Sequence, residues 1–253
     1  MKDERQHHDE FYGDEASHVF GSAVFLRSRE RYLDFLKTSL KRPEPPSLLS
    51  LGVGDGAYEL SVAPLVRRLV GIELSPVASE IGRRRATSAG FSHLEFRDGD
   101  ARSLRTIAAG ETFDVIWAVA LLHHLASDEQ SAILADVAAC LNPGGVFMSV
   151  DPSRRRLVGY LKSLVPEKIS RYHSPDEEEI DFTKLAQQVT SAGLTVEAIF
   201  PVDYFLNPLA WVLPRTPAVV VPALSALDTA LCFSPGIRRF ASSFGVVARK
   251  SLS

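Results

Sequence analysis

The chain has 253 residues, of which 45% are hydrophobic and 23% charged, so it can bury a core without disulfides or structural metals. Its 28 Lys and Arg against 31 Asp and Glu give a net charge of −3, which offers no general attraction to nucleic acid. Two isolated cysteines and a polar first ten residues favour a reducing, cytoplasmic setting over a disulfide framework, a zinc site or secretion.

The segment before residue 45 is expected to be helical. Between residues 16 and 40, apolar side chains recur at helical spacing and alternate with Arg and Glu, which predicts one or two amphipathic helices. Prolines at 43, 45 and 46 then break the chain.

From residue 47 onward, short apolar strands alternate with helices. Strands are expected at 47–51, 68–73, 93–97, 113–118 and 146–150. Helices are expected at 57–66, 76–89, 101–109 and 128–141. This alternation predicts an α/β fold with a doubly wound, Rossmann-like, mostly parallel sheet that carries helices on both faces. Ligands bind such sheets at the carboxyl ends of the strands.

The pattern beyond residue 150 is less regular. Helices are expected at 154–164 and 182–192, and strands at 194–200 and 244–249. Between these two strands, residues 201–236 hold only three charged side chains but six of the 15 prolines, which predicts two or three short apolar helices or turns. Four roles stay open for this insertion: core packing, a wall of an apolar acceptor pocket, a homodimer face, or peripheral contact with a membrane.

A glycine-rich turn follows the first expected strand. Gly52, Gly54 and Gly56 alternate with Val53 and Asp55, and such glycines permit positive φ and let a ligand approach the backbone. The run also fits the Gly-x-Gly-x-x-Ala pattern of dinucleotide-binding proteins, so an NAD(P)-dependent oxidoreductase is one reading of this turn.

Acidic residues end the next two strands. Glu73 lies 21 residues beyond Gly52, where a carboxylate can accept hydrogen bonds from both hydroxyls of a ribose. Ser75 and the following proline suit the start of a helix, which leaves Glu73 available to a ligand. Asp100 follows the third strand and is either an acceptor for an adenine amine or a helix N-cap.

Six motifs in order resemble those of class I S-adenosylmethionine-dependent methyltransferases, in the branch that includes ubiquinone-biosynthesis and small-molecule enzymes. The motifs are the glycine turn, Glu73, Asp98-Gly99-Asp100-Ala101, Phe113-Asp114-Val115-Ile116, Leu121-Leu122-His123-His124-Leu125 and Leu141-Asn142-Pro143-Gly144-Gly145. The resemblance covers residues 45–152 and implies S-adenosylmethionine as the cofactor.

The resemblance implies a role for each motif. Residues Gly52, Val53, Gly54 and Gly56 would surround the methionine part of the cofactor, Glu73 and Leu74 would bind the ribose, and Asp100 and Ala101 would bind the adenine, with Ala118 also in contact. Residues 1–44 would form a helical lid over a methyltransferase domain at 45–253, with Tyr12 as a cofactor contact. The family usually has an acid where this chain has Ser50, so a negative charge near the cofactor's ammonium group is missing; Asp55 is a possible replacement.

Two adjacent histidines lie at the ligand edge of the expected sheet. Because adjacent side chains point in different directions, we expect only one to face the acceptor. The resemblance favours a structural role for His124, which makes His123 the candidate general base; backbone hydrogen bonding is the alternative role for both.

These features predict an S-adenosylmethionine-dependent methyltransferase, with no metal, that acts on a small, partly hydrophobic or lipid-linked acceptor, with methylation of a hydroxyl as the favoured reaction. The alternatives are an NAD(P)-dependent oxidoreductase and a non-catalytic subunit that binds an adenosyl ligand. Nucleic acid is not expected as a partner, because the charge is near neutral and the strand at 113–118 lacks a following Asn/Asp-Pro-Pro-aromatic motif.

Overall fold

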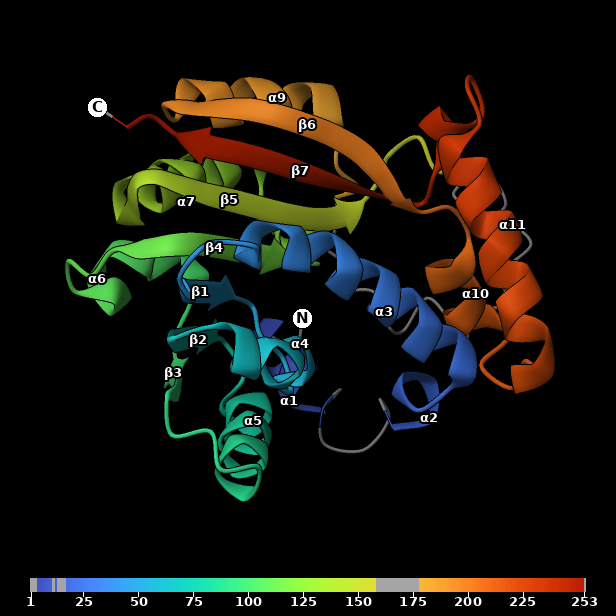
Figure 1. The fold of residues 1–253 in the computed structure, drawn as a ribbon, viewed down its shortest axis with the longest axis horizontal. Coiled ribbons are helices and arrows are strands. Elements are labelled where there is room, and N and C mark those ends of the chain that lie inside the picture. Colours follow the sequence, from blue (N-terminus) through green and yellow to red (C-terminus); the bar gives the residue numbers. More distant parts are fainter. Residues whose placement is uncertain (1–3, 11, 13–16, 158–177, 253) are drawn as a thin grey trace.

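A seven-stranded, mostly parallel sheet organises the computed structural model, which describes residues 4–10, 12, 17–157 and 178–252. The strand order is β3-β2-β1-β4-β5-β7-β6, and β7 runs antiparallel to the strands on both sides of it, β5 and β6 (Figure 1). The strands are β1 (Ser47–Leu51), β2 (Arg68–Glu73), β3 (Leu94–Asp98), β4 (Phe113–Val119), β5 (Leu141–Pro152), β6 (Leu194–Asp203) and β7 (Ser243–Lys250). This order confirms the doubly wound α/β prediction.

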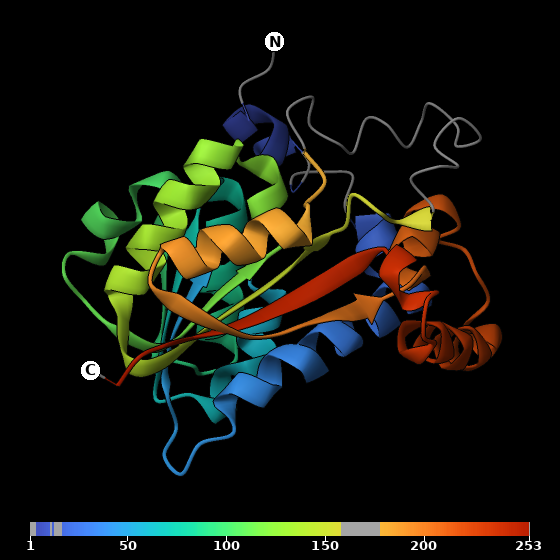
Figure 2. The same cartoon turned by 90° about the horizontal axis from the view of Figure 1, so that it is seen from above.

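Helices cover both faces of the sheet. One face carries α3 (Ala23–Leu36), α4 (Ala57–Val62) and α5 (Pro76–Ser88), and the other carries α6 (Leu104–Ala108), α7 (Ser127–Cys140) and α9 (Phe182–Ser191). Figure 2 shows α3 on one side of the sheet and α7 and α9 on the other. Because β1 is buried along its whole length, its leucines alternate between the two hydrophobic cores.

Several element boundaries differ from the sequence prediction. The helix expected at 57–66 ends at Val62 and continues as a 3₁₀ turn, Ala63–Leu65, because Pro64 cannot donate a helical hydrogen bond. Both β5 and β6 extend beyond the predicted strands. Their carboxyl-terminal ends pair with β7, and β5 begins at Leu141, which pairs with Phe113 of β4. Of the helix expected at 154–164, residues 154–157 form a turn and the rest lies outside the described residues.

The insertion folds as the predicted short helices between β6 and β7. These are α10 (Leu206–Val212), η7 (Ala218–Val220) and α11 (Val221–Phe233), and the 3₁₀ turn η8 (Arg238–Phe240) follows the insertion before β7. Fully buried Asp228 attaches α11 to the loop after β6, because its carboxylate accepts hydrogen bonds from the backbone N–H groups of Tyr204, Phe205 and Leu206. Arg31 of α3 pairs with the same carboxylate at 2.9 Å. The insertion is therefore anchored on α3 by a buried polar network.

The N-terminal residues do not form one structural unit. Helix α3 and the turn η2 (Lys37–Leu40) contribute Tyr32, Leu33, Phe35, Leu36 and Leu40 to the core beneath the sheet. Ahead of them, α1 (Glu4–Glu10) packs on α5, and α2 (Ser17–Phe20) precedes α3. Because α3 and η2 belong to the core, the candidates for the predicted lid are the residues before α3, and their role as a lid stays a prediction. Within the described ranges, no helix is both long and apolar enough to cross a bilayer.

Candidate active site

A cavity of about 380 Å³ opens at the carboxyl ends of the parallel strands. Its floor is formed by the turns that follow β1, β2, β3 and β4 and by the end of β5, and its sides by α3, α10, His8, Tyr12 and Phe20. Pockets that bind small molecules typically have volumes of roughly 300–1,000 Å³ and sit at this edge of doubly wound sheets. The cavity therefore lies where the sequence placed the ligand.

The glycine turn forms one end of this cavity. Gly52, Gly54 and Gly56 have φ values of 69°, 53° and 74°, all in the left-handed region. A Cβ on Gly54 would collide with the hydroxyl of Tyr12, so this glycine keeps the floor clear. Gly52, Val53 and Gly54 line the cavity. Gly56 does not line the cavity, and a Cβ at this position would meet the Phe96 ring and Gly82 of α5.

Glu73 supports the glycine turn from the end of β2. It is 5% exposed, and its two oxygens accept hydrogen bonds from the backbone N–H groups of Gly54 at 2.7 Å and Ser75 at 3.0 Å. Burial raises the pKa of this carboxyl, and the two N–H donors oppose that rise. Ser75 caps α5 by accepting from Ala78 N–H, as predicted. Glu73 and Leu74 line the cavity, so the ribose role stays open to them.

Asp100 and Ala101 lie at the adenine end that the motif order implies. Asp100 accepts a hydrogen bond from the backbone N–H of Arg102 at 2.9 Å and pairs with that guanidinium at 2.8 Å. It therefore caps the short 3₁₀ turn η4 (Ala101–Ser103), which is the structural role that the sequence left open. Asp100 and Ala101 both line the cavity, so capping and ligand binding are compatible.

Ala118 does not line the cavity. It points into the core formed by α7 and the sheet and is fully buried, while the next residues on the strand, Val119 and Ala120, form the cavity wall. Side chains alternate along a strand, so an error of one residue places the contact on the wrong face. Ala120 has a positive φ of 51°, which turns the chain at the cavity edge.

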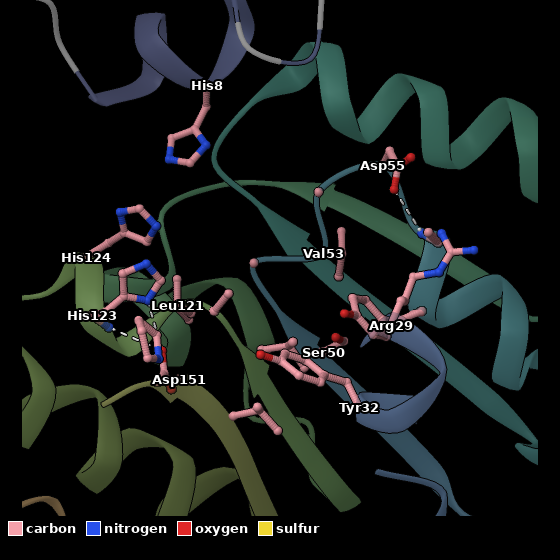
Figure 3. A pocket seen from close by; sticks show the side chains of 18 of the residues that line it. His8, Arg29, Tyr32, Ser50, Val53, Asp55, Leu121, His123, His124 and Asp151 are labelled. Carbon is pink, nitrogen blue, oxygen red and sulfur yellow. Dashed lines mark hydrogen bonds and ion pairs between the residues drawn. The ribbon is translucent and has the colours of Figure 1, made fainter. Parts of the chain in front are cut away.

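His123 and His124 both line the cavity, and the expectation that only one of them faces the acceptor stays a prediction. They lie on the 3₁₀ turn η5 (Leu122–His124), and their rings are tilted by 39° with centroids 4.1 Å apart. The His8 ring of α1 meets His124 edge-on at 5.4 Å. Figure 3 shows these three rings facing the glycine turn across the cavity.

Asp151 orients His123. Its Oδ1 lies 3.1 Å from His123 Nδ1 and also accepts from the His123 backbone N–H at 3.3 Å. Asp151 is 1% exposed at the end of β5, which is the neighbour of β4 in the sheet. Within the described part of the chain, its Oδ2 has no hydrogen-bond partner. The carboxylate therefore favours a proton on Nδ1 and leaves Nε2 as an acceptor.

The sequence did not identify an acid next to Ser50. Glu59 of α4 is 2% exposed and accepts a hydrogen bond from Ser50 Oγ at 2.6 Å, and both residues line the cavity. Asp55, the predicted replacement for the missing acid, is engaged by the Arg85 guanidinium at 2.5 Å. The available signal was an acid two residues after Ala57 in an otherwise apolar first turn.

Aromatic side chains form the outer wall of the cavity. Trp211 and Pro208 come from α10 of the insertion, while Phe20 and Phe25 come from the N-terminal helices. The Trp211 ring meets Phe20 and Phe25 edge-on at 6.2 and 6.3 Å, and its Nε1 donates to Asn207 Oδ1. One face of the insertion therefore provides apolar surface to the site.

These features fit S-adenosylmethionine. The glycine turn leaves room for a ligand against the backbone, and Glu73 and Asp100, the predicted partners of its ribose and adenine, line the same cavity. The cofactor carries positive charge on its sulfonium and ammonium groups, and a buried carboxylate oxygen of Glu59 has no partner among residues 4–10, 12, 17–157 and 178–252. The residues present can thus satisfy the cofactor's polar groups.

Comparisons with known proteins agree with this geometry. Residues 48–145 match the family model described as a methyltransferase domain. The chain is 28% identical over 193 residues to the ubiquinone biosynthesis O-methyltransferase of Methylobacterium sp. (strain 4-46), covering 70% of this chain and 72% of that protein. The protein of the same name from Parvibaculum lavamentivorans is 28% identical over 209 residues, with 79% of each chain covered.

A solved structure shares the fold. Magnesium protoporphyrin IX methyltransferase from Synechocystis PCC 6803, determined with bound SAH, superposes with a TM-score of 0.65 at 12% identity over 98% of each chain. The sequence matches favour the methyltransferase reading of the glycine turn over the NAD(P)-dependent one. With the strand order and the cavity described above, they identify this chain as a member of the class I S-adenosylmethionine-dependent methyltransferases.

Proposed function

We propose that the enzyme methylates a hydroxyl group on a small, partly hydrophobic acceptor, free or lipid-linked, with His123 as the general base. The observation that carries this proposal is the His123–Asp151 pair at the cavity floor. The relatives named as O-methyltransferases support the same reaction type.

The pair suits removal of a hydroxyl proton. Bound S-adenosylmethionine supplies an electrophilic methyl group. His123 Nε2 would accept the proton of the acceptor hydroxyl while the methyl group passes from the sulfonium to the acceptor oxygen, which leaves S-adenosylhomocysteine as the second product; Nδ1–H would keep its hydrogen bond to Asp151. The buried carboxylate then stabilises the imidazolium that forms. Because the positive charge of the sulfonium already activates the methyl group, the protein's other tasks are to align the acceptor and to exclude water. We assign both tasks to Trp211, Phe20 and Tyr12, which line the cavity.

The aromatic outer wall supports an acceptor with an apolar part. Trp211 and Val212 belong to the insertion and line the cavity, and the Trp211 ring meets the Phe25 ring of α3 edge-on. An alkyl or aryl group against this wall would be removed from water at roughly 25 cal/mol per Å². We assign the remaining predicted cofactor contacts, Gly52 to Gly54, Glu73, Leu74, Asp100, Ala101 and Tyr12, to the opposite end of the cavity on the strength of their lining positions.

The outward surface of the insertion supports a contact with an apolar partner. Its most exposed apolar side chains are Leu213, Val219, Leu227 and Phe233, which are 53–84% exposed. Apolar side chains that gather on a surface are typical of an interaction site. We propose that it meets either a lipid surface or a second copy of the chain; vesicle flotation and light scattering during size-exclusion chromatography separate the two.

Product analysis tests the function directly. The enzyme is incubated with S-adenosylmethionine and either hexylcatechol or hexylaniline, and products are identified by mass spectrometry. We expect an O-methylated catechol and little product from the aniline. Faster N-methylation of the aniline, or a methyl group on ring carbon, would contradict the proposed reaction.

A further inference from the structure

Glu59 is a buried acid that the proposed methyl-transfer step does not use. It lies on the first turn of α4, directly after the glycine turn, and its Oε1 accepts the Ser50 hydroxyl proton at 2.6 Å. Its Oε2 is also buried, and no donor reaches it within the described ranges. Burying a carboxylate oxygen without a partner is costly, so this atom has unused capacity to bind a ligand.

The surroundings of Glu59 favour a cation. The titratable or charged groups on this side of the cavity are Asp55, Glu73, Tyr12, Tyr58 and Arg29. The two acids act on Glu59 in the same direction as its burial, so its carboxylate is harder to ionise in the empty site. A positive group placed at Oε2 would relieve both effects. Asp55 is already paired with Arg85, and both oxygens of Glu73 accept backbone N–H groups, so Glu59 Oε2 is the carboxylate oxygen at this end of the cavity that no described donor reaches.

Glu59 brings a negative charge next to Ser50, where the sequence itself has no acid. Ser50 lies near the end of β1, where the family resemblance of the sequence implies an acid. Here the Ser50 hydroxyl holds the Glu59 carboxylate at that strand end, so a side chain nine residues later supplies the negative charge. The serine is therefore part of a relocated acidic site, which accounts for its burial at 2% exposure.

We propose that Glu59, positioned by Ser50, binds the α-ammonium group of S-adenosylmethionine. This inference rests on the cofactor and is independent of the acceptor and of the role of His123. Burial raises the pKa of Glu59 to about 7 in the empty site, and a bound ammonium group favours the ionised form. Cofactor binding should therefore release a proton near neutral pH.

Calorimetric titration with S-adenosylhomocysteine, and with its analogue that carries hydrogen in place of the α-amino group, tests this assignment without measuring activity. We expect Glu59→Gln to weaken binding of S-adenosylhomocysteine by about 10- to 100-fold, as for loss of a charge-assisted hydrogen bond, and to change binding of the deaminated analogue by less than about threefold. Glu80→Gln, which removes an exposed acid on α5, is the matched control and should change neither.

Two further measurements keep the test decisive if Glu59→Gln folds poorly. In the wild type, affinity for S-adenosylhomocysteine should fall about tenfold from about pH 8 to about pH 6, while affinity for the deaminated analogue should not. The double variant Ser50→Asp/Glu59→Ser returns the acid to the strand end and should bind S-adenosylhomocysteine within about threefold of wild type. Equal losses for both ligands in Glu59→Gln, or identical pH profiles for both ligands, would overturn the assignment.

Discussion

The role of Asp151 gives the sharpest prediction about catalysis. In Asp151→Asn the side chain keeps its size, but its amide nitrogen can donate to His123 Nδ1, which favours the tautomer with the proton on Nε2. That tautomer cannot accept the acceptor's proton. General-base catalysis contributes about 10²- to 10⁴-fold, so kcat should fall by this factor, equivalent to about 3–5 kcal/mol of activation free energy. Binding of S-adenosylhomocysteine should change by less than about threefold.

The assay compares two acceptors. With hexylcatechol, whose hydroxyl carries a proton, Asp151→Asn should show the full loss of kcat. With a nitrocatechol at about pH 8, the hydroxyl is already ionised and the loss should shrink to less than about tenfold. Ser149→Ala, which alters a buried hydroxyl on the same strand, is the control and should retain wild-type kcat. Equal losses with both acceptors, or a kcat near wild type with hexylcatechol, would refute the general-base role.

Three further predictions concern the cofactor end and the outer wall. Gly54→Ala should lower stability by about 1–2 kcal/mol and weaken S-adenosylhomocysteine binding, because φ is 53° and its Cβ would meet Tyr12; Gly110→Ala, with φ of 82° and open space, should lose stability alone. Glu59→Gln should raise the melting temperature of the empty enzyme at about pH 8 and much less at about pH 5. The pKa of the Glu59 carboxyl is about 7 in the folded chain and near 4.5 in the unfolded chain, so the wild-type free energy of unfolding falls by about 3 kcal/mol as pH rises through this window, whereas glutamine does not titrate. Trp211→Ala should raise KM for hexylcatechol by about tenfold or more and leave cofactor affinity unchanged; a similar effect on both would contradict its place in the acceptor wall.

Local sequence patterns were sufficient to predict the sheet and to place the glycine turn, Glu73 and Asp100 at one edge of it, where they line the same cavity. Strand and helix periodicity gave the alternation, and the glycine turn, Glu73 and Asp100 lie at strand ends whose position follows from parallel topology. These features depend on neighbours in the chain. Ala118 and Gly56 show the limit of that reasoning, because one residue along a strand or turn changes which side a group faces.

The charge relationships depended on contacts between distant segments. Asp151 meets His123 across 28 residues, because β4 and β5 are adjacent in the sheet. The hydrogen bond between Ser50 and Glu59 forms because the glycine turn brings the two residues together, and a separation of nine residues does not by itself predict a contact. The use of α10 as a cavity wall depends on the buried attachment of Asp228 to Arg31. No periodic pattern of apolar residues in the sequence predicts these contacts, because each joins residues from different elements.

Carbon-13 labelling of the transferred methyl group tests the central claim most directly. The enzyme is given S-adenosylmethionine labelled at the methyl carbon together with hexylcatechol, and the product is examined by NMR. The account predicts one labelled methoxy group, whose formation slows by about 10²- to 10⁴-fold in His123→Ala while S-adenosylhomocysteine still binds. A label on nitrogen or ring carbon in any acceptor tested, or an undiminished rate in His123→Ala, would contradict it.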